Sequence, residues 1–465
     1  MRYFCKKYRI NMKKYVSLIA FLLMTTLAMA QSTGKQYLYR VYLTDKKGTP
    51  YSLKQPEKFL SPKAIERRKK QHLKLDATDL PVSPQYITAV EQLGVKVVSK
   101  SKWNNTLVVS TNDEAVAKQL QQQGFVRKVV KVWTSPDSVK YAKRYALTSL
   151  TKKDTIMADY YGAGQRQITM LGGDSLHAAG YTGRGITIAV VDGGFMNVDS
   201  IPSMQRIDIL GSRDFVATGR HQLFDELDHG TSVLSCIAMK EPYLMVGTAP
   251  DASFWLLRSE DSYSESLVEE DYWAAAVEFA DSVGADIISS SLGYYEFDDK
   301  STSHQYKELN GRTALISCSS SLLAGKGIVH VNSAGNAGRG TWKKIGFPAD
   351  AIDMLTVGAA DSSKKNTVFS SLGPAADGRV KPDVMAMGLN TAVVKGNGRL
   401  GKANGTSFSC PVTAGMVACL WQALPQKTAK EIIEIVRQNG DNYTTPDNVF
   451  GYGFPNYWQA YIKNK

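Results

Sequence analysis

Cysteine, histidine and long apolar runs are all scarce in this chain of 465 residues. After residues 16–29, no run reaches the roughly 18 apolar residues that a membrane-spanning helix needs, so we predict no membrane span. No Cys/His spacing suggests a zinc site. Cys410 and Cys419 would lie about 13.5 Å apart along one helix, too far to pair. For Cys236, Cys318, Cys410 and Cys419 we expect buried free thiols, with a disulfide as the alternative.

The first 30 residues have the pattern of an export signal. Six Lys and Arg residues precede the apolar stretch 16–29, and Ala28-Met29-Ala30 supplies the small-residue cleavage pattern before Gln31. We therefore expect the protein to be exported. A generic signal of this kind leaves open whether the protein stays in the periplasm or becomes extracellular.

The net charge of +13 is spread unevenly. Residues 1–30 carry +6, residues 31–153 carry +15 and residues 154–465 carry −8. Opposite charges favour a prosegment that docks on the domain after it, because complementary potentials promote encounter and fix register. A basic, independently soluble domain is the alternative. Because the larger part of the chain is acidic, we predict no nucleic-acid partner.

Residues 36–133 have the order strand, helix, strand, strand, helix, strand. The strands are expected at 37–43, 95–99, 106–110 and 126–133, and the helices at 83–93 and 112–123. This βαββαβ order is the split, ferredoxin-like α+β motif. The basic run 64–70 inside its first connection is predicted to be a solvated charged helix, with a protease-cleavable site as the alternative. Residues 134–165 are polar and aperiodic, which predicts a linker.

Beyond the linker, short apolar runs alternate with helical patterns. The expected strands lie at 186–191, 254–257, 287–290, 328–331 and 354–357, with helices at 229–239 and 269–283 among them. This alternation predicts an α/β domain with a parallel sheet covered by helices on both faces. In such sheets, functional residues gather at the carboxyl ends of the strands.

Residues 404–411, Asn-Gly-Thr-Ser-Phe-Ser-Cys-Pro, precede the apolar run 412–424. We expect a sharp turn at Gly405 that becomes a buried helix, with Thr406 or Ser407 as its cap and Pro411 in its first turn. A hydroxyl held there lies where N–H groups and the helix dipole favour developing negative charge, as a nucleophilic serine requires. Taken alone, Ser407 could merely cap a helix.

Four further stretches follow predicted strands or open a helix. Asp192, before two glycines, could orient a histidine, and His229 at a helix start could act as a general base. Asn336 could donate to an oxyanion together with the Ser407 N–H. Residues 291–293 could pair with an extended peptide. Each of these four stretches could also be an ordinary turn, helix terminus or strand end without a functional role.

Together, in the order Asp, His, Asn, Ser, these motifs resemble the subtilisin-like serine proteases (subtilases, peptidase family S8). The matching stretches are Val190-Val191-Asp192-Gly193-Gly194, His229-Gly230-Thr231, Ser291-Leu292-Gly293, Ser333-Ala334-Gly335-Asn336 and Gly405-Thr406-Ser407-Phe408-Ser409-Cys410-Pro411. The resemblance implies that Asp192 orients His229, which takes the proton from Ser407 as it attacks a peptide carbonyl. Asn336 and the Ser407 amide would then hold the oxyanion.

The same resemblance implies a substrate cleft. Its lining would comprise Ser291, Leu292, Gly293, Ser333, Ala334 and Gly335, with Gly346 at the floor of the first specificity pocket. A glycine there suggests a deep pocket for a large apolar side chain. The chemistry needs no cofactor. Structural calcium, common in the family, could bind the acidic segment 294–326, where a solvated loop is the alternative; the metal ligands stay unknown.

The resulting prediction is a secreted, self-processing zymogen of a serine endopeptidase. It comprises a signal peptide at 1–30, an inhibitory and chaperone-like propeptide at 31–133, a linker with the maturation site at 134–165, and a subtilisin-like peptidase domain at 166–465. We expect a monomer whose partners are protein or peptide substrates and its own propeptide.

Three other kinds of protein are alternatives to this prediction. The first is a catalytically silent binding protein with the same fold, and the second is a purely structural secreted protein. The third is an esterase or lipase of the α/β-hydrolase type. That class requires Gly-x-Ser-x-Gly and the order Ser, Asp, His, whereas here the frame is Gly-Thr-Ser-Phe-Ser and the order is Asp, His, Ser.

Overall fold

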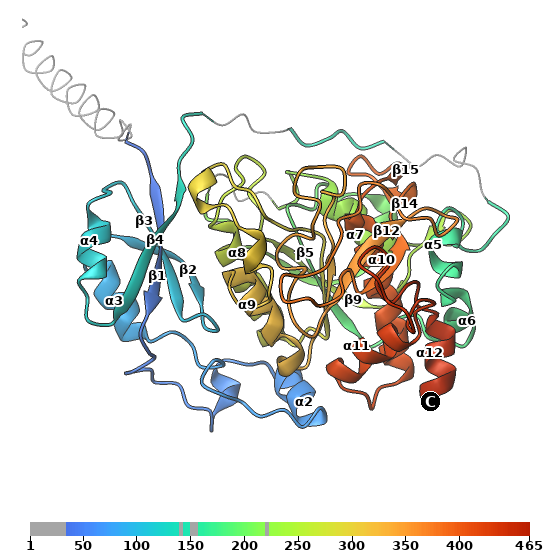
Figure 1. Cartoon of the computed structure of the whole chain (residues 1–465), viewed down its shortest axis with the longest axis horizontal. Helices are drawn as coiled ribbons and strands as arrows, with labels where there is room; N and C mark the ends of the chain where they lie inside the picture. Colours follow the sequence, from blue (N-terminus) through green and yellow to red (C-terminus); the bar gives the residue numbers. More distant parts are fainter. Residues whose placement is uncertain (1–33, 139–142, 149–156, 219–222) are drawn as a thin grey trace, which may run out of the picture.

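The computed structural model describes residues 34–138, 143–148, 157–218 and 223–465. These residues form a small amino-terminal domain and a larger α/β domain (Figure 1). The predicted export signal at 1–30 lies outside the described residues. Within them, no helix combines the length and the hydropathy that a membrane span requires.

The amino-terminal domain is a four-stranded antiparallel sheet with two helices packed on it. Its sheet has the order β2-β3-β1-β4, and every pair of neighbours is antiparallel. This confirms the ferredoxin-like motif. Its elements are β1 (Tyr37–Leu43), α3 (Pro84–Glu91), β2 (Lys96–Ser101), β3 (Thr106–Thr111), α4 (Val116–Gln121) and β4 (Val126–Thr134). Side chains such as Val41, Leu107, Val109 and Leu120 form its core because alternate strand residues face the helices.

A long connection, residues 44–83, joins β1 to α3, and we call it the arm. It contains η1 (Pro56–Lys58) and α2 (Pro62–Lys70). The Ser61 hydroxyl caps α2 by accepting the Ala64 N–H at 3.2 Å. The prediction of a solvated helix was wrong, because Arg67 and Arg68 are only 5% and 3% exposed. They are buried against the larger domain, which also argues against a protease-cleavable site there.

The larger domain is built on a seven-stranded sheet whose paired strands are all parallel, as predicted. In spatial order its strands are β13 (Val384–Met387), β12 (Leu355–Ala360), β11 (Val329–Ser333), β10 (Ile287–Ser290), β5 (Thr187–Asp192), β9 (Ser253–Arg258) and β6 (Asp208–Asp214). The two strands not predicted have physical reasons. Edge strand β6 has no buried side chain and carries charges, so it lacks an apolar run, and β13 is a short edge strand that directly follows Pro382-Asp383, a pair typical of turns.

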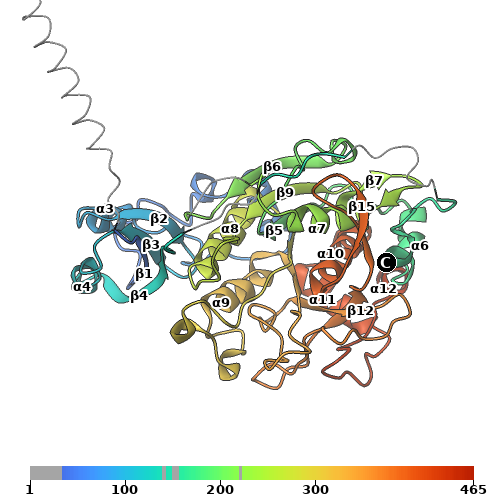
Figure 2. The ribbon, with the colours of Figure 1, turned by 90° about the horizontal axis from the view of Figure 1, so that it is seen from above.

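Helices cover both faces of this sheet (Figures 1 and 2). On one face, Ile188 and Val190 of β5 share a core with α7 (His229–Ala238), α10 (Thr406–Ala423), α11 (Ala429–Gln438) and α12 (Tyr457–Asn464). On the other face, Ala189 and Val191 pack with α8 (Glu269–Val283) and α9 (Leu315–Leu322). The side chains of successive β5 residues therefore pack into cores on opposite faces of the sheet, which explains why the strand is apolar throughout.

Shorter elements complete the domain. They are α5 (Gln165–Thr169), α6 (Gly173–Ala178), η2 (Pro202–Met204), β7 (Lys240–Glu241), β8 (Met245–Val246), η3 (Lys300–Thr302), η4 (Tyr306–Glu308), η5 (Ala324–Lys326), β14 (Thr391–Val394) and β15 (Leu400–Ala403). The order of the sheet reverses between β5 and β10, because the chain fills one side of β5 with β9 and β6 and then returns beside it as β10. Such a switch point opens a crevice at the carboxyl ends of the strands.

The two domains meet along α8. Leu38, Val108, Val132 and Trp133 of the small sheet share an apolar cluster with Val216, Val268 and Tyr272 of the larger domain. Figure 1 shows the small sheet beside α8, while the arm with α2 lies beneath the larger domain. The small domain therefore reaches the larger one from two sides.

The cysteines in the described residues are free. Cys236, Cys410 and Cys419 are buried, and Cys318 is half-buried. This confirms free thiols over a disulfide, although Cys318 is less buried than expected.

Candidate active site

A histidine and a buried carboxylate meet at the carboxyl end of β5. Asp192, 1% exposed, places its two carboxylate oxygens 2.9 and 3.0 Å from Nδ1 of His229. The same carboxylate accepts the Gly193 N–H at 2.8 Å, which fixes its orientation. The His229 side chain keeps 35% of its surface exposed, so its other face remains open to a ligand.

Glycines allow the chain segments around this pair to approach. A Cβ at Gly194 would lie 2.0 Å from the Glu226 carbonyl oxygen, and one at Gly230 would lie 2.4 Å from the Gly194 oxygen. The Gly230 N–H donates to that same oxygen at 3.0 Å. The loop after β5 is thereby bonded to the first turn of α7, which sets His229 beside Asp192.

Ser407 lies in the first turn of α10, and the predicted details of that turn need correction. The helix begins at Thr406 with Gly405 (φ 146°) as its cap residue, and no side chain caps it. Pro411 is inside the helix rather than in its first turn. Ser407 is 8% exposed, and its hydroxyl donates to the Ser291 carbonyl at 3.2 Å instead of to His229. The next side chain, Phe408, lies against the His229 ring with centroids 5.6 Å apart.

The proline inside α10 is tolerated because another donor replaces its missing N–H. In a regular helix the amide of residue 411 would donate to the Ser407 carbonyl, four residues earlier. Here the Ser291 hydroxyl donates to that carbonyl at 2.8 Å. Ser291 and Ser407 therefore exchange two hydrogen bonds, which join the end of β10 to the start of α10.

Asn336 is exposed beside the same helix start. Its side-chain oxygen accepts the Thr406 N–H at 2.9 Å and the Thr406 hydroxyl at 3.0 Å. Because the oxygen is held from that side, the amide nitrogen is the group left to donate to a ligand. Thr406 is thus a positioning residue that the sequence treated only as a possible cap.

The predicted cleft residues form two neighbouring strand ends. The Gly346 N–H donates to the Ala334 oxygen at 3.1 Å, and a Cβ at Gly346 would lie 3.4 Å from the Tyr294 oxygen and 3.5 Å from the Gly293 carbonyl carbon. Gly346 is therefore enclosed between the segments 291–293 and 333–335. The Gly335 N–H donates to the Thr406 hydroxyl at 3.1 Å, so the second segment also touches the start of α10.

The charges around His229 favour its protonated form. Burial opposes that form, but the charge and hydrogen bond of Asp192, with smaller contributions from Glu260 and Asp228, raise the pKa of His229 to about 9. Burial and the nearby Asp192 carboxylate raise the pKa of Glu260 to about 8. Glu260 was not singled out from the sequence, although it lies two residues beyond the apolar strand β9, much as Asp192 ends β5.

The acidic segment after the cleft strand does not fit a calcium site. Asp298 accepts the Glu265 N–H, Asp299 caps η3, and Glu308 accepts the Gln305 N–H. Over the described ranges, no three His, Cys, Asp or Glu side chains gather as metal ligands would. These carboxylates serve as caps for backbone amides instead.

Comparisons with known proteins agree with this geometry. The family model described as the subtilase family matches residues 183–453, more than half of the chain. The chain belongs to the subtilase family. A model of the peptidase S8 propeptide domain of Bacteroidota matches residues 38–147. We therefore call the two parts of the structure the propeptide and the peptidase domain.

Subtilases of Bacillus are among the similar proteins. Subtilisin NAT of Bacillus subtilis subsp. natto and subtilisin E of Bacillus subtilis (strain 168) are each 29% identical over 318 residues, covering 68% of this chain and 75% of theirs. Subtilisin of Bacillus pumilus is 29% identical over 267 residues, 57% of this chain and 87% of that protein. This subtilase is accordingly a serine endopeptidase with a propeptide, and the prediction of an S8 peptidase is confirmed.

Proposed function

We propose that Asp192, His229 and Ser407 form the catalytic triad of this endopeptidase. The observation that carries the proposal is the hydrogen bond between a buried Asp192 and His229, with the first turn of α10 against the imidazole. Asp192 holds Nδ1 protonated, which leaves Nε2 to take a proton. To react, the Ser407 hydroxyl turns from the Ser291 carbonyl toward Nε2, a rotation about one side-chain bond.

The reaction then proceeds by acyl transfer. Ser407 attacks the peptide carbonyl while His229 accepts its proton, and the imidazolium is stabilised by Asp192. His229 returns the proton to the departing amine, and water hydrolyses the acyl-enzyme by the same route. The Asn336 amide nitrogen and the Ser407 N–H supply donors for the oxyanion. Because Thr406 holds the Asn336 oxygen, this donor is oriented before the substrate arrives.

Substrate binds as an extended peptide beside residues 291–293 and 333–335. Backbone pairing at a free strand end gives affinity with little dependence on sequence, which suits protein or peptide substrates in general. Gly346 between these segments leaves room for a side chain, and we retain the proposal of a large apolar residue there. Calcium takes part in no step of the proposed reaction.

The precursor is proposed to be exported and to cut itself within residues 134–165. Two contacts tie the described flanks of this segment to the peptidase domain. Trp133, just before the segment, donates its indole N–H to the Ser264 hydroxyl at 3.3 Å. Arg144 donates to Asp225 at 2.9 Å, three residues before the Asp228 that precedes His229. These contacts support cleavage by the domain that holds the segment.

The test is the intact mass of protein expressed from Gln31, wild type beside Ser407→Ala. We expect the wild type to lose its basic segment by a cut within residues 134–165 and Ser407→Ala to remain whole. A wild type that stays whole, and that a serine-directed phosphonate does not label, would instead support a silent fold. Equal cutting of both proteins would assign the cut to a host protease and contradict self-processing.

A further inference from the structure

The arm binds the peptidase domain at the edge of the sheet opposite the candidate active site. The Lys63 ammonium lies 3.0 Å from the Asp286 carboxylate, and the Ser61 N–H donates to the Ser282 oxygen at 2.9 Å. Asp286 directly precedes β10, whose other end leads into the cleft. Figure 1 shows α2 beneath the peptidase domain, while residues 143–148 lie above it.

Arg67 of the arm covers the carboxyl ends of two peptidase helices. Its guanidinium donates to the carbonyl oxygens of Ala285 at 2.5 Å and Lys326 at 3.2 Å, and to the Asp281 carboxylate at 2.5 Å. Ala285 follows α8, and Lys326 ends η5. Helix carboxyl ends expose carbonyls without partners and carry partial negative charge, so a planar guanidinium with several donors suits this place.

Arg68 binds the same carboxylate and lies within 3.0 Å of both of its oxygens. It donates to Asp281 at 3.0 Å and to Asp79 of the arm at 3.0 Å. Lys102 of the propeptide adds a third cation, 3.2 Å from Asp281. Asp281 is fully buried, so its carboxylate depends on these donors for its charge. Asp79 is also fully buried and lies 3.0 Å from the Lys326 ammonium as well.

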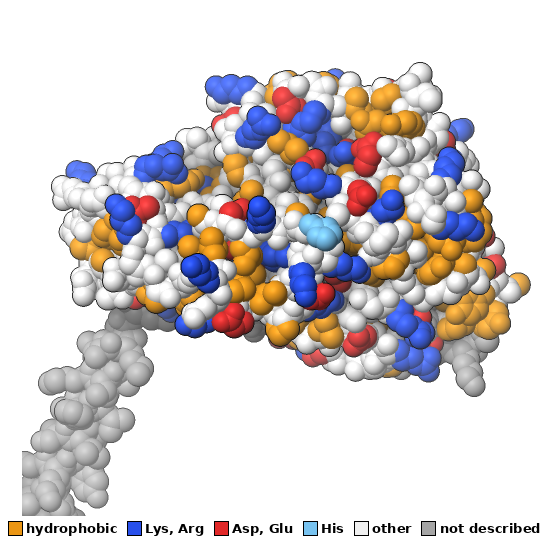
Figure 3. All heavy atoms as spheres, turned by 90° about the horizontal axis from the view of Figure 1, so that it is seen from below, with side chains coloured by type: hydrophobic (Ala, Val, Ile, Leu, Met, Phe, Trp, Pro, Cys, Tyr) orange, Lys and Arg blue, Asp and Glu red, His pale blue; other side chains and the backbone are white. Residues whose placement is uncertain are grey.

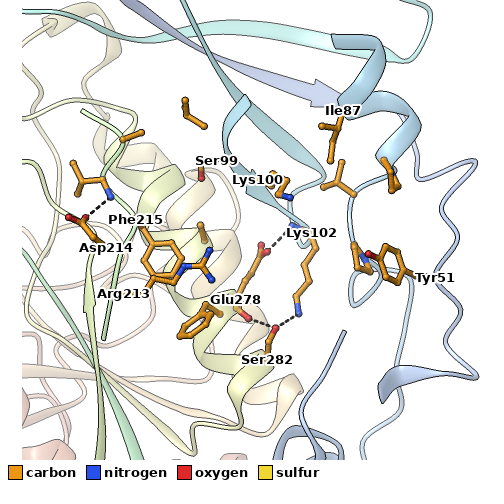
Figure 4. A pocket seen from close by; sticks show the side chains of 18 residues that line it. Tyr51, Ile87, Ser99, Lys100, Lys102, Arg213, Asp214, Phe215, Glu278 and Ser282 are labelled. Carbon is orange, nitrogen blue, oxygen red and sulfur yellow. Dashed lines mark hydrogen bonds between the residues drawn. The ribbon is translucent and has the colours of Figure 1, made fainter. Parts of the chain in front are cut away.

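Asp281 belongs to an acidic face of α8 that meets the propeptide along its length. One turn earlier, Glu278 accepts the backbone N–H groups of Lys102 at 2.7 Å and Trp103 at 3.0 Å. Two turns before that, both carboxylate oxygens of Asp271 accept the Nε–H of Arg40, each at 2.8 Å. Figure 4 shows Lys102 beside Glu278 and Ser282 at a cavity of about 530 Å³ between the two domains. The basic and acidic parts of the sequence therefore meet at α8.

We infer that Asp281 and the carboxyl ends of α8 and η5 form a binding site for a diarginine helix, and that this site retains the propeptide after the linker is cut. This inference rests on the proposed self-processing in one respect only, namely which protease cuts the linker. Gln71 extends the site by donating to the Gly327 oxygen and accepting the Ala429 N–H, each at 2.9 Å. The ligand class is a helix bearing adjacent arginines, here supplied by α2.

Retention follows from what departure of the arm would expose. Removing α2 would take Arg67 and Arg68 away from a buried carboxylate and leave the carbonyls of Ala285 and Lys326 without these donors. In the bound state these charge-assisted hydrogen bonds are shielded from water and salt, so they hold the arm more tightly than exposed ion pairs would. Cutting the linker above the sheet changes none of these contacts beneath it.

The experiment separates retention from catalysis. A recognition sequence for a site-specific protease is inserted within residues 134–165 of the full chain carrying Ser407→Ala, and the cut protein is examined by size-exclusion chromatography. We expect the two fragments of the parent to elute together. With Arg67→Ala and Arg68→Ala they should separate, because the dissociation constant rises about 30-fold or more when one side of a buried charged pair is truncated.

A matched control comes from the same helix. Lys69 and Lys70 are exposed, so Lys69→Ala with Lys70→Ala removes equal charge and should leave the fragments together. Arg67→Lys with Arg68→Lys keeps the charge but loses the forked donors, and we expect weakened retention even if the alanine protein fails to fold. Separation of the parent fragments, or retention in both arginine variants, overturns the inference. Neither result bears on self-processing, since Ser407 is absent throughout.

Discussion

At the scale of single residues, the proposed base His229 should set the pH at which this peptidase works. The base must be neutral to accept a proton, and Asp192 with Glu260 raises the pKa of His229 to about 9. We therefore expect kcat/KM to rise with pH and to level off only near or above about 9. The measurement is the pH dependence of kcat/KM for the processed protein on a peptide substrate.

The Glu260→Gln protein provides the control for this profile. It removes one negative charge beside His229, so the pKa of His229 should fall and the acid limb should move to lower pH. Suppose instead that kcat/KM of the wild type rises around the ordinary histidine pKa of about 6.5 and that Glu260→Gln does not shift this rise. That result would contradict the claim that Asp192 and Glu260 raise the pKa of His229.

The sequence predicted the proposed site residues better than their local geometry. Asp192, His229, Asn336 and Ser407 stand in recognisable motifs, and the structure brings all four to one edge of the sheet. Thr406 stands in the same motif as Ser407, but its bonds to Asn336 do not follow from that motif, and Glu260 lies in no motif. Their importance arises from which segments the fold places together, and a single sequence does not specify that.

At the scale of secondary-structure elements, α10 depends on a hydroxyl from another strand. Ser291→Ala should leave the Ser407 carbonyl without a donor and lower the free energy of unfolding by about 1–3 kcal/mol. Adding Pro411→Ala restores an N–H at the position that normally bonds this carbonyl, so the double variant should recover part of the loss. Urea unfolding of full chains carrying Ser407→Ala measures both changes.

Ser363→Ala is the matched control for this cycle, because Ser363 is exposed and distant from α10 in sequence. It should leave the unfolding free energy nearly unchanged. Equal losses in the single and double variants would contradict the replacement of the proline N–H by Ser291.

Element boundaries were predictable where one pattern dominated. β1 and α8 match their predicted bounds because a run rich in Tyr, Leu and Val marks the strand and Gly284 ends the helix. The arm was misread since a basic run is usually solvated, and nothing local reveals that Asp281 lies more than 200 residues further along to receive it. Long-range charge pairing of this kind follows from tertiary structure alone.

At the scale of the whole molecule, the contact between α2 and the peptidase domain should persist at mildly acidic pH. Burial disfavours the charged carboxylate, but Lys102, Arg67 and Arg68 outweigh it and lower the pKa of Asp281. A carboxylate with a lowered pKa contributes its full stabilisation above the ordinary value of about 3.9 and loses it only as pH falls through the lowered value.

The cut protein carrying Ser407→Ala should therefore stay together from about pH 8 down to about pH 5, as size-exclusion chromatography at each pH would reveal. Release on mild acidification would show that Asp281 does not dominate the contact. The lower face of the molecule in Figure 3 mixes Lys and Arg with acidic and hydrophobic side chains. The buried arginines, not a basic surface patch, should therefore govern retention.

The free cysteines have a consequence for how the protein is made and handled. Burial raises the pKa of the Cys318 thiol to about 11 and of the Cys410 thiol to about 12, and it also raises the pKa of Cys236 and Cys419. Protonated thiols react slowly with disulfides and oxidants. Over the described residues, the fold is thus indifferent to redox potential: dithiothreitol should leave it intact, and the chain can mature equally on either side of a membrane that separates reducing from oxidising solution.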